Sequence, residues 1–377
     1  MLRVCIAGTM DTSFHRNRLV IDLLERTGCE LDFRLVRFWG ERGDRIVREG
    51  KLRLGLRAAL LLPVVVCRFI RAPKPDVLLV GYPGHLDMLV LGPIAKLRRV
   101  PIVFDAFLSL FDTVVSDRKL LPPRSISGRI LAAIDRWACR LADLSVVDTP
   151  AHATFFSDLS RLPEDRFRVL WVGAEERLFH PRDEEPEPGR VLFYGTYIPL
   201  HGVATIIEAA KLLQGEAVRF RVIGSGQQRL EIGRLVQELR LDNVDLAEPL
   251  PLERLPDEIA KAVLCLGIFG DSDKAFRVIP NKVFQALAMG RPVITADTPA
   301  MRAAFKADEV VMVPATDPAA QASSILALVK DQERARELAF RGHARYLRDY
   351  SQQTLAGRLR LLLKEAAELS PASRRVG

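Results

Sequence analysis

The stretch from Asp271 to Pro299, DSDKAFRVIPNKVFQALAMGRPVITADTP, constrains the fold more than any other part of the chain. We interpret it as a loop, a helix, a glycine stop, a buried strand and a second loop. Apolar residues recur at helical spacing from Val283 to Ala288, and Gly290 ends the pattern. Pro292 to Ala296 then reads as a short apolar strand. Helices that alternate with short buried strands are typical of a parallel α/β sheet.

The start of this predicted helix is polar and basic. Asn281, Lys282 and Gln285 lie in its first turns, and Lys274 and Arg277 stand just before it. The first N–H groups of a helix are unpaired and carry partial positive charge, which suits a phosphate group. The stretch therefore predicts a pyrophosphate site in which Arg277 and Lys282 are the candidate catalytic residues.

The motif P-N-K-V-F-Q-A-L-A-M-G-R-P-V-I at 280–294 resembles the signature helix of GT-B glycosyltransferases, especially those of family 4. Most members carry Glu where this chain has Gln285, and an acidic residue where it has Arg277. The resemblance implies an α/β GT-B fold, with two Rossmann-like domains facing across a cleft and the nucleotide sugar in the second. It also implies metal-independent transfer with retention, without a cofactor besides the donor. Asn281 and Gln285 would then contact the nucleotide, with Gln285 at the ribose.

With 377 residues, the chain can form two domains that each have their own core. Apolar runs followed by polar loops occur on both sides of a charged, proline-rich break. We expect an acceptor-side Rossmann-like domain at 1–182, a linker at 183–189, a nucleotide-sugar-binding domain at 190–345 and a helical segment at 346–377.

Two loops of the second predicted domain are candidates for donor binding. The loop that includes His201 matches the place where many GT-B enzymes supply a basic residue to the donor diphosphate, and the glycine pair after the next strand resembles the family's G-x-G loop. Glycines let the backbone approach a ligand closely. The alternatives are that His201 caps a helix and that the glycines serve tight turns. The predicted residues are Gly195, His201, Gly202, Gly224 and Gly226.

Several polar residues follow the predicted strands of the first domain. In open parallel sheets, ligands bind outside the carboxyl ends of the strands. Each residue could instead cap a helix, but together they predict an acceptor site, to which the polar loop after the first strand adds a histidine and an arginine. The predicted residues are His15, Arg16, His85, Asp105 and Asp148.

The net charge of +8 and the pI near 9.4 favour anionic partners. Charges of both signs are interleaved and aromatic residues are few, which argues against nucleic acid. The apolar region from Lys51 to Ile70 has basic flanks, and its uninterrupted core is too short to span a bilayer. It predicts a core-packing helix, which we favour, or a weak contact with an anionic membrane.

No secretory leader or zinc-like cysteine spacing is evident, which favours a cytoplasmic protein, peripheral at the inner membrane face if the membrane contact exists. The five cysteines are interpreted as buried free thiols. We expect a hexosyltransferase that takes a nucleotide-sugar donor and a glycan or lipid-linked acceptor, in glycan or glycolipid assembly. The alternatives are a sugar-nucleotide 2-epimerase and a non-catalytic sugar- or lipid-binding GT-B protein.

Overall fold

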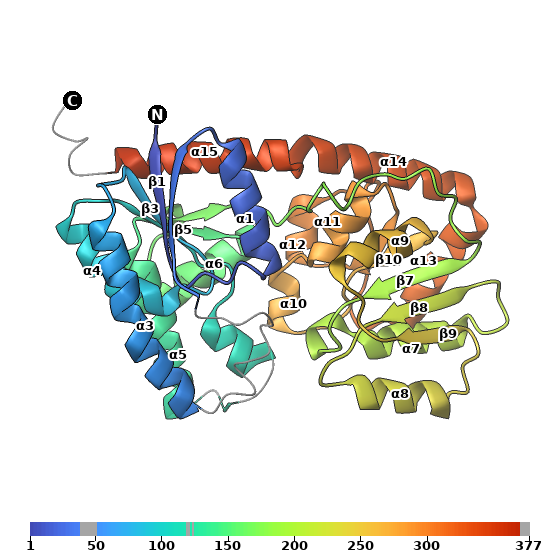
Figure 1. Ribbon diagram of the computed structural model, residues 1–377. Coiled ribbons are helices and arrows are strands. Elements are labelled where there is room, and N and C mark those ends of the chain that lie inside the picture. The colour runs from blue at the N-terminus through green and yellow to red at the C-terminus, as the bar shows by residue number, and fades with distance from the viewer. Residues whose placement is uncertain (38–50, 118–120, 123, 370–377) are drawn as a thin grey trace. The chain divides into compact units, whose positions relative to one another are not determined.

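The computed structural model describes residues 1–37, 51–117, 121–122 and 124–369 (Figure 1). The chain divides into two compact units. Unit 1 comprises Met1–Trp171 and Leu355–Gly377, and unit 2 comprises Val172–Thr354. Each unit contains one six-stranded parallel sheet. No helix in the described part of the chain combines the length and apolar character needed to cross a membrane.

The sheet of unit 1 has the order β2-β1-β3-β4-β5-β6. Its central strands are apolar and buried on both faces, as parallel strands between two layers of helices must be. Its strands are β1 Arg3–Gly8, β2 Glu30–Leu35, β3 Val77–Val80, β4 Ile102–Asp105, β5 Leu144–Val147 and β6 Phe167–Val169. Its helices are α1 His15–Arg26, α3 Lys51–Arg71, α4 His85–Leu97, the π-helical η1 Asp112–Asp117, α5 Ile126–Leu141, α6 Pro150–Ser160, the short η2 Glu164–Arg166 and α15 Gln352–Glu368.

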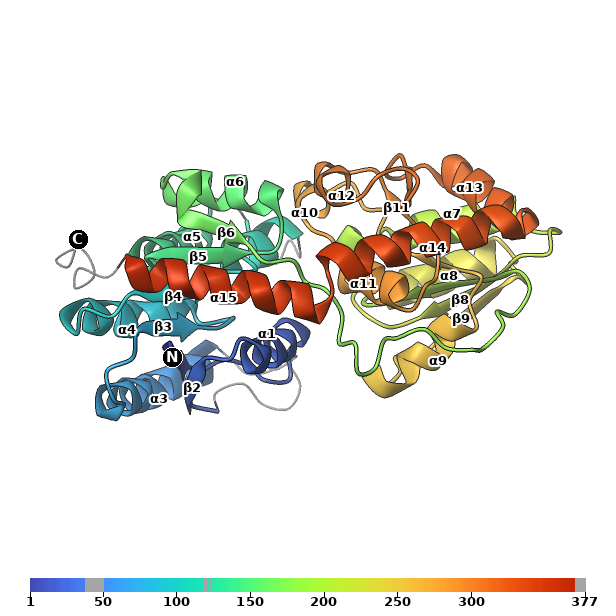
Figure 2. The same cartoon turned by 90° about the horizontal axis from the view of Figure 1, so that it is seen from above.

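Four helices of unit 1 share one core with the sheet. Buried residues of α3, α4, α5 and α6 belong to a single apolar cluster with the strands, including Phe69, Met88, Ala138 and Phe156. Helix α4 packs against both α3 and α5 (Figure 2). The prediction that the Lys51–Ile70 region packs on the core is confirmed for one side of α3, because Val65 and Phe69 are fully buried.

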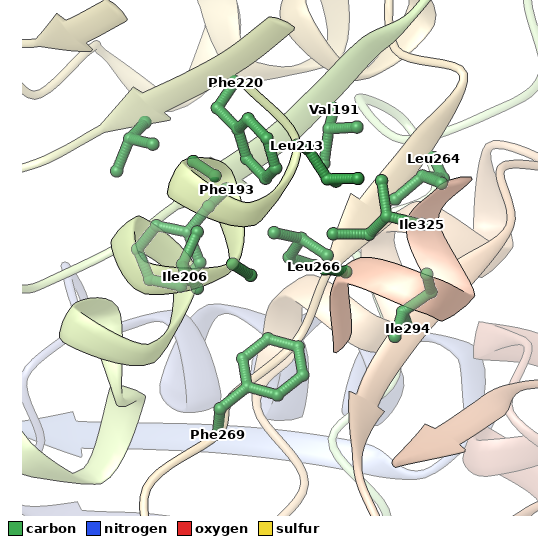
Figure 3. Close-up of a cluster of buried hydrophobic side chains, with 14 of the residues drawn as sticks. Val191, Phe193, Ile206, Leu213, Phe220, Leu264, Leu266, Phe269, Ile294 and Ile325 are labelled. Atoms are coloured by element: carbon green, nitrogen blue, oxygen red, sulfur yellow. The ribbon is translucent and has the colours of Figure 1, made fainter. Parts of the chain in front are cut away.

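The sheet of unit 2 has the order β12-β11-β10-β7-β8-β9. Its strands are β7 Arg190–Tyr194, β8 Arg219–Ile223, β9 Val244–Ala247, β10 Leu264–Leu266, β11 Val293–Ala296 and β12 Val311–Val313. Its helices are η3 Pro199–His201, α7 Val203–Leu212, α8 Arg229–Glu238, η4 Leu252–Arg254, α9 Leu255–Ala260, α10 Asp273–Arg277, α11 Asn281–Ala288, α12 Pro299–Ala304, α13 Pro318–Lys330 and α14 Gln332–Asp349. Figure 3 shows part of its core, to which β7 contributes Phe193, α7 contributes Ile206 and α13 contributes Ile325.

The Asp271–Pro299 stretch folds largely as predicted. Helix α11 begins one residue after Pro280, Gly290 follows its end with φ +65°, and β11 comes next. The prediction of a plain loop before the helix is wrong. Residues Asp273–Arg277 form the short helix α10, whose N-cap Ser272 accepts a hydrogen bond from the N–H of Ala275 at 3.2 Å.

The cysteine prediction is correct only in part. All five thiols are free, and Cys5, Cys139 and Cys265 are buried. Cys29 is half-buried and Cys67 is exposed, so these two are not core thiols. Burial raises the pKa of the three buried thiols to about 12, which keeps them protonated.

Candidate functional site

The order of strands in unit 2 reverses between β7 and β10. Ligands of doubly wound sheets bind at the carboxyl ends of the strands at such a switch point. The segment after β7 carries Gly195 and His201, and the segment after β10 leads through α10 into α11, which carries Lys282. The topology thus brings the two predicted donor-binding segments to one place in the unit.

Lys282 is a buried cation to which the described residues offer no acceptor. Its side chain lies in the first turn of α11 and is only 5% exposed. Within the described residues its Nζ has no hydrogen-bond partner, and it lies 3.9 Å from the centroid of the Phe193 ring. Burial holds the pKa of Lys282 well below its usual value. A desolvated ammonium of this kind would gain strongly from an anion.

His201 and Lys282 converge on Gly195. A Cβ atom added to Gly195 would lie 2.9 Å from Lys282 Nζ and 3.1 Å from His201 Cε1, and φ of Gly195 is +150°. A larger residue would therefore fill the space between the two side chains. Only glycine leaves it open to a ligand.

The hydrogen bond of His201 fixes its proton. Its Nδ1 contacts the carbonyl oxygen of Thr196, which can only accept, so Nδ1 carries the hydrogen. Burial, together with the charge of Lys282, holds the pKa of His201 well below its usual value. The ring is neutral and its Nε2 can only accept. The expectation that His201 supplies a basic residue to the donor diphosphate therefore does not fit this geometry.

The predicted glycine loops pack tightly against one another. A Cβ on Gly224 would lie 1.9 Å from the carbonyl oxygen of Gly195, and one on Gly226 would lie 2.6 Å from that of Tyr197. Gly202 likewise lies against the backbone of Phe269. Beside these loops lies a cavity of about 220 Å³. It is lined by Tyr194, Gly195, Thr196, Ile223, Gly224, Ser225, Pro249, Leu250 and Leu255.

Gln285 is buried rather than solvated, with 3% of the residue exposed. Its Oε1 accepts a hydrogen bond of 2.8 Å from the Tyr194 hydroxyl, which ties α11 to the end of β7. Asn281 begins α11 and is half-buried. Arg277 ends α10, a helix that packs through Ala275 on Leu200, the residue before His201.

In unit 1, Arg16 and Asp105 bind each other. Arg16 is fully buried, and its Nε and Nη2 donate to the Asp105 carboxylate at 2.9 and 3.1 Å. Its Nη1 donates to the carbonyl oxygen of Leu170 at 2.8 Å. The pair joins α1, β4 and the segment after β6. The expectation that these two residues grip an acceptor is corrected, because their hydrogen-bonding groups are used within the fold. The predicted loop position of Arg16 is also wrong, since it lies on α1.

His85 and Asp148 are also buried. His85 Nε2 lies 3.3 Å from Asp135, and burial lowers the pKa of the ring. Asp148 pairs with Nδ1 of His152 at 2.6 Å. Asp148 directly follows β5, as predicted, whereas His85 begins α4 instead of lying in the loop after β3, and both side chains are buried. His15, the first residue of α1, is half-buried. Acceptor contacts by these residues remain predictions.

Three aromatic residues of unit 1 were missed by the sequence reasoning. Unit 1 reverses its strand order between β1 and β3, and Phe14 and Tyr82 follow these strands, with ring centroids 5.1 Å apart. Phe107, after β4, lies 5.6 Å from Tyr82 and has φ +37°, an unusual backbone for a bulky residue. The sequence did contain a signal for this cluster, because each of the three segments that follow β1, β3 and β4 carries one of these aromatic residues.

Two parallel α/β sheets in separate units define the GT-B class of fold, and solved structures share it. Sucrose-phosphate synthase of Thermosynechococcus elongatus superposes with a TM-score of 0.74 at 16% identity, covering 97% of this chain and 99% of that one. HepE of Anabaena in complex with UDP gives a TM-score of 0.69 at 14% identity, covering 97% and 100%. The predicted fold class is confirmed.

The sequence comparisons support the resemblance to glycosyltransferases. Residues 188–331 match the family described as Glycosyl transferases group 1. The chain is 22% identical over 329 residues to the putative colanic acid biosynthesis glycosyltransferase WcaL of Escherichia coli K12, covering 83% of this chain and 76% of that protein. The family match, the relative and the shared fold together support a GT-B glycosyltransferase similar to family 4, as the signature helix implied.

Proposed function

We propose that the protein transfers a sugar from a nucleoside diphosphate to a hydroxyl group of a glycan or lipid-linked acceptor. The observation that carries this proposal is the buried ammonium of Lys282, which has no acceptor among the described residues and lies at the switch point of unit 2. A crystal structure of the similarly folded HepE holds UDP-glucose, and WcaL is named for colanic acid biosynthesis. Both support a nucleotide-sugar donor and a role in polysaccharide assembly.

In this proposal the donor diphosphate binds at the start of α11. Pro280, the N-cap, has no side-chain acceptor, and within the described part of the chain only the Val283 N–H donates to its carbonyl oxygen, so the N–H groups of Asn281 and Lys282 are assigned to a phosphate. Lys282 supplies a desolvated positive charge, and Arg277 supplies a planar group suited to two phosphate oxygens. Negative charge grows on the diphosphate as the glycosidic bond breaks, so these contacts strengthen towards the transition state.

The uncharged parts of the donor are assigned to the neighbouring groups. The cavity of about 220 Å³ beside Gly195 and Gly224 has apolar walls from Ile223, Pro249 and Leu250, which suit a nucleobase. The amide of Gln285, on α11, is proposed to contact the ribose. His201, with an accepting Nε2, is proposed to receive a hydrogen bond from a donor hydroxyl rather than to donate to phosphate.

The chemical step we propose is metal-independent and retains the anomeric configuration. The bond between the anomeric carbon and the phosphate oxygen breaks, and a bond to the acceptor oxygen forms on the same face. The acceptor proton passes to an oxygen of the leaving diphosphate, so that no protein base is required. The aromatic trio Phe14, Tyr82 and Phe107 is proposed as an apolar platform for the acceptor in unit 1.

The test is a transfer assay with UDP-, GDP- and ADP-sugars and a panel of hydroxyl acceptors. Lys282→Ala and Arg277→Ala should each lower kcat/KM by more than about tenfold, or ~1.4 kcal/mol. Lys330→Ala on α13, an exposed lysine paired with Glu216, is the matched control. Losses of about twofold or less would mean that the diphosphate binds elsewhere.

Three further readouts address the finer claims. Proton NMR of the product reports retention, and activity after chelation reports metal independence. Epimerisation of the donor without an acceptor would instead identify a sugar-nucleotide 2-epimerase. Nucleotide binding without turnover on any acceptor would support a non-catalytic protein.

A further inference from the structure

We propose that unit 1 docks on an anionic lipid surface through the outward sides of α3, α4 and α5, here called the three-helix face. These helices pack side by side over one side of the sheet, with α4 in contact with both neighbours (Figures 1 and 2). Such docking concerns the location of the protein rather than its chemistry. It does not depend on the identity of the donor or acceptor.

Each helix presents an apolar stripe to solvent in addition to the one that it buries. On α3 the stripe is Leu60, Val64 and Ile70; on α4 it is Leu86, Leu89 and Leu97; on α5 it is Ile126, Ile130 and Trp137. On α4 and α5 the positions recur at helical spacing, and on α3 Leu60 and Val64 do, with Ile70 at the edge of the same side. Leu97 is 85% exposed and Ile126 is 77% exposed, so these are not the margins of the core.

This clustering is specific to one part of the chain. Sixteen large apolar residues of the described chain are exposed, and the three-helix face holds three on each helix, hence nine of the sixteen. Isolated exposed apolar residues need no explanation, but a cluster on adjacent elements marks an interaction surface.

The charge of the same face has one sign. Helix α3 contains no acidic residue, and the acidic residues of α4 and α5, Asp87 and Asp135, are buried. Basic residues remain between and beside the apolar stripes, and Arg140 lies over the Trp137 ring at 5.7 Å. They are Arg68, Arg71, Lys96 and Arg129, which are exposed, and Arg136 and Arg140, which are half-buried and donate to carbonyl oxygens of α6.

A lipid surface satisfies both properties, whereas a second copy of the chain would not. In a two-fold dimer the face would meet itself, and its cations would be brought together without acidic partners. The cores of protein interfaces are also depleted of charge. An anionic bilayer accepts apolar side chains at the acyl boundary and basic side chains among its headgroups. The mixture of the two on one face therefore favours lipid.

The experiment is co-sedimentation of the full chain with vesicles of neutral phosphatidylcholine, with and without about a third of phosphatidylglycerol. We expect binding only to the anionic vesicles, and weaker binding as salt rises from about 0.1 to about 1 M, because the Debye length falls from about 10 to about 3 Å. Ile130→Glu and Arg129→Glu should each reduce the partition coefficient by about fivefold or more. Leu230→Glu on α8 and Arg360→Glu on α15, exposed positions outside the face, are the matched controls.

A second measurement guards against misfolded variants. Brominated acyl chains should quench the fluorescence of Trp137 in the folded parent, and Trp137→Phe should remove this quenching while the melting temperature is unchanged. Equal binding to neutral vesicles, no binding to either, or losses in the controls as large as in the variants would overturn the proposal. Dimerisation that Ile130→Glu abolishes, without vesicle binding, would assign the face to a second copy. None of these readouts involves donor turnover, so they stand or fall separately from the proposed transfer activity.

Discussion

Lys282→Met is expected to stabilise the ligand-free protein and to abolish its stabilisation by nucleotide. Methionine has a similar length and fills the same volume beside Phe193, but it carries no charge. Two effects of opposite sign from one substitution distinguish a ligand-binding cation from a structural one. If Lys282 stabilised the fold, its replacement would lower the stability of the protein.

The magnitudes follow from the surroundings of the ammonium. An unsatisfied buried polar group costs about 1–3 kcal/mol. The cation–π contact of Lys282 Nζ with the Phe193 ring, at 3.9 Å, offsets about 0.5–2 kcal/mol of this cost. The net gain for methionine is about 1 kcal/mol, or about 2–4 °C in melting temperature for a unit of this size. In the parent, nucleotide at a hundred times its Kd should add about 2.7 kcal/mol.

The gain should depend on pH. The pKa of Lys282 is lowered by burial in the folded state, whereas the unfolded lysine keeps its usual pKa near 10.5. Between these two values the unfolded chain binds the extra proton, so the stability of the parent rises with pH. The advantage of Lys282→Met should therefore be largest at low pH and should shrink towards pH 10.

The assay is differential scanning fluorimetry of parent and variant from pH 7 to 10, with UDP, GDP or ADP and without nucleotide. Lys330→Met, at an exposed position on α13, controls for the loss of a charge. A Lys282→Met variant that melts below the parent, and whose melting temperature a nucleotide still raises by the parental amount, would refute this reasoning. In that case the ammonium would be part of the fold and the diphosphate site would lie elsewhere.

Three further predictions concern the framework of the two units, and urea or thermal unfolding measures each. Gly224→Ala should destabilise the fold by about 2 kcal/mol or more, because its Cβ would lie 1.9 Å from the Gly195 carbonyl oxygen and φ is +148°. Gly233→Ala on α8, whose new methyl group would meet nothing within 4 Å, should be neutral or stabilising. Similar losses of stability in both variants would contradict the packing argument. Arg16→Met should cost about 3–5 kcal/mol of stability, because it leaves Asp105 buried without its partner. The double variant Arg16→Met with Asp105→Leu should recover much of this loss. A loss in the double variant equal to the sum of the two single losses would refute the coupling. Burial raises the pKa of Asp87 to about 6, so between about pH 4 and 6 the folded state keeps a proton that the unfolded state loses. The stability of the parent should therefore fall over this range, whereas that of Asp87→Asn should stay level. Parallel plots of stability against pH would show that Asp87 does not titrate in this range.

The sequence by itself determined the elements whose cause is local. Helix α11, its glycine stop and strand β11 were predictable because apolar spacing, a left-handed glycine and a β-branched run act within a few residues. The alternation of such segments along the chain also determined the α/β class. The signature motif at 280–294 also indicated the GT-B fold, because its pattern is local.

Tertiary structure decided the environment of each polar residue. Nothing local distinguishes Lys282, which is buried with no acceptor among the described residues, from Lys330, which is exposed and paired. Arg16 and Asp105 meet across a separation of 89 residues, and this contact turns two predicted acceptor ligands into a structural pair.

The tautomer of His201 and the burial of Gln285 likewise depend on which atoms the fold brings beside them. The same holds for α3, which packs one side on the core and leaves Leu60, Val64 and Ile70 exposed beside similar stripes on α4 and α5. Residue type and spacing fix which side of a helix is apolar. The neighbours that cover that side, or fail to cover it, come from distant parts of the chain.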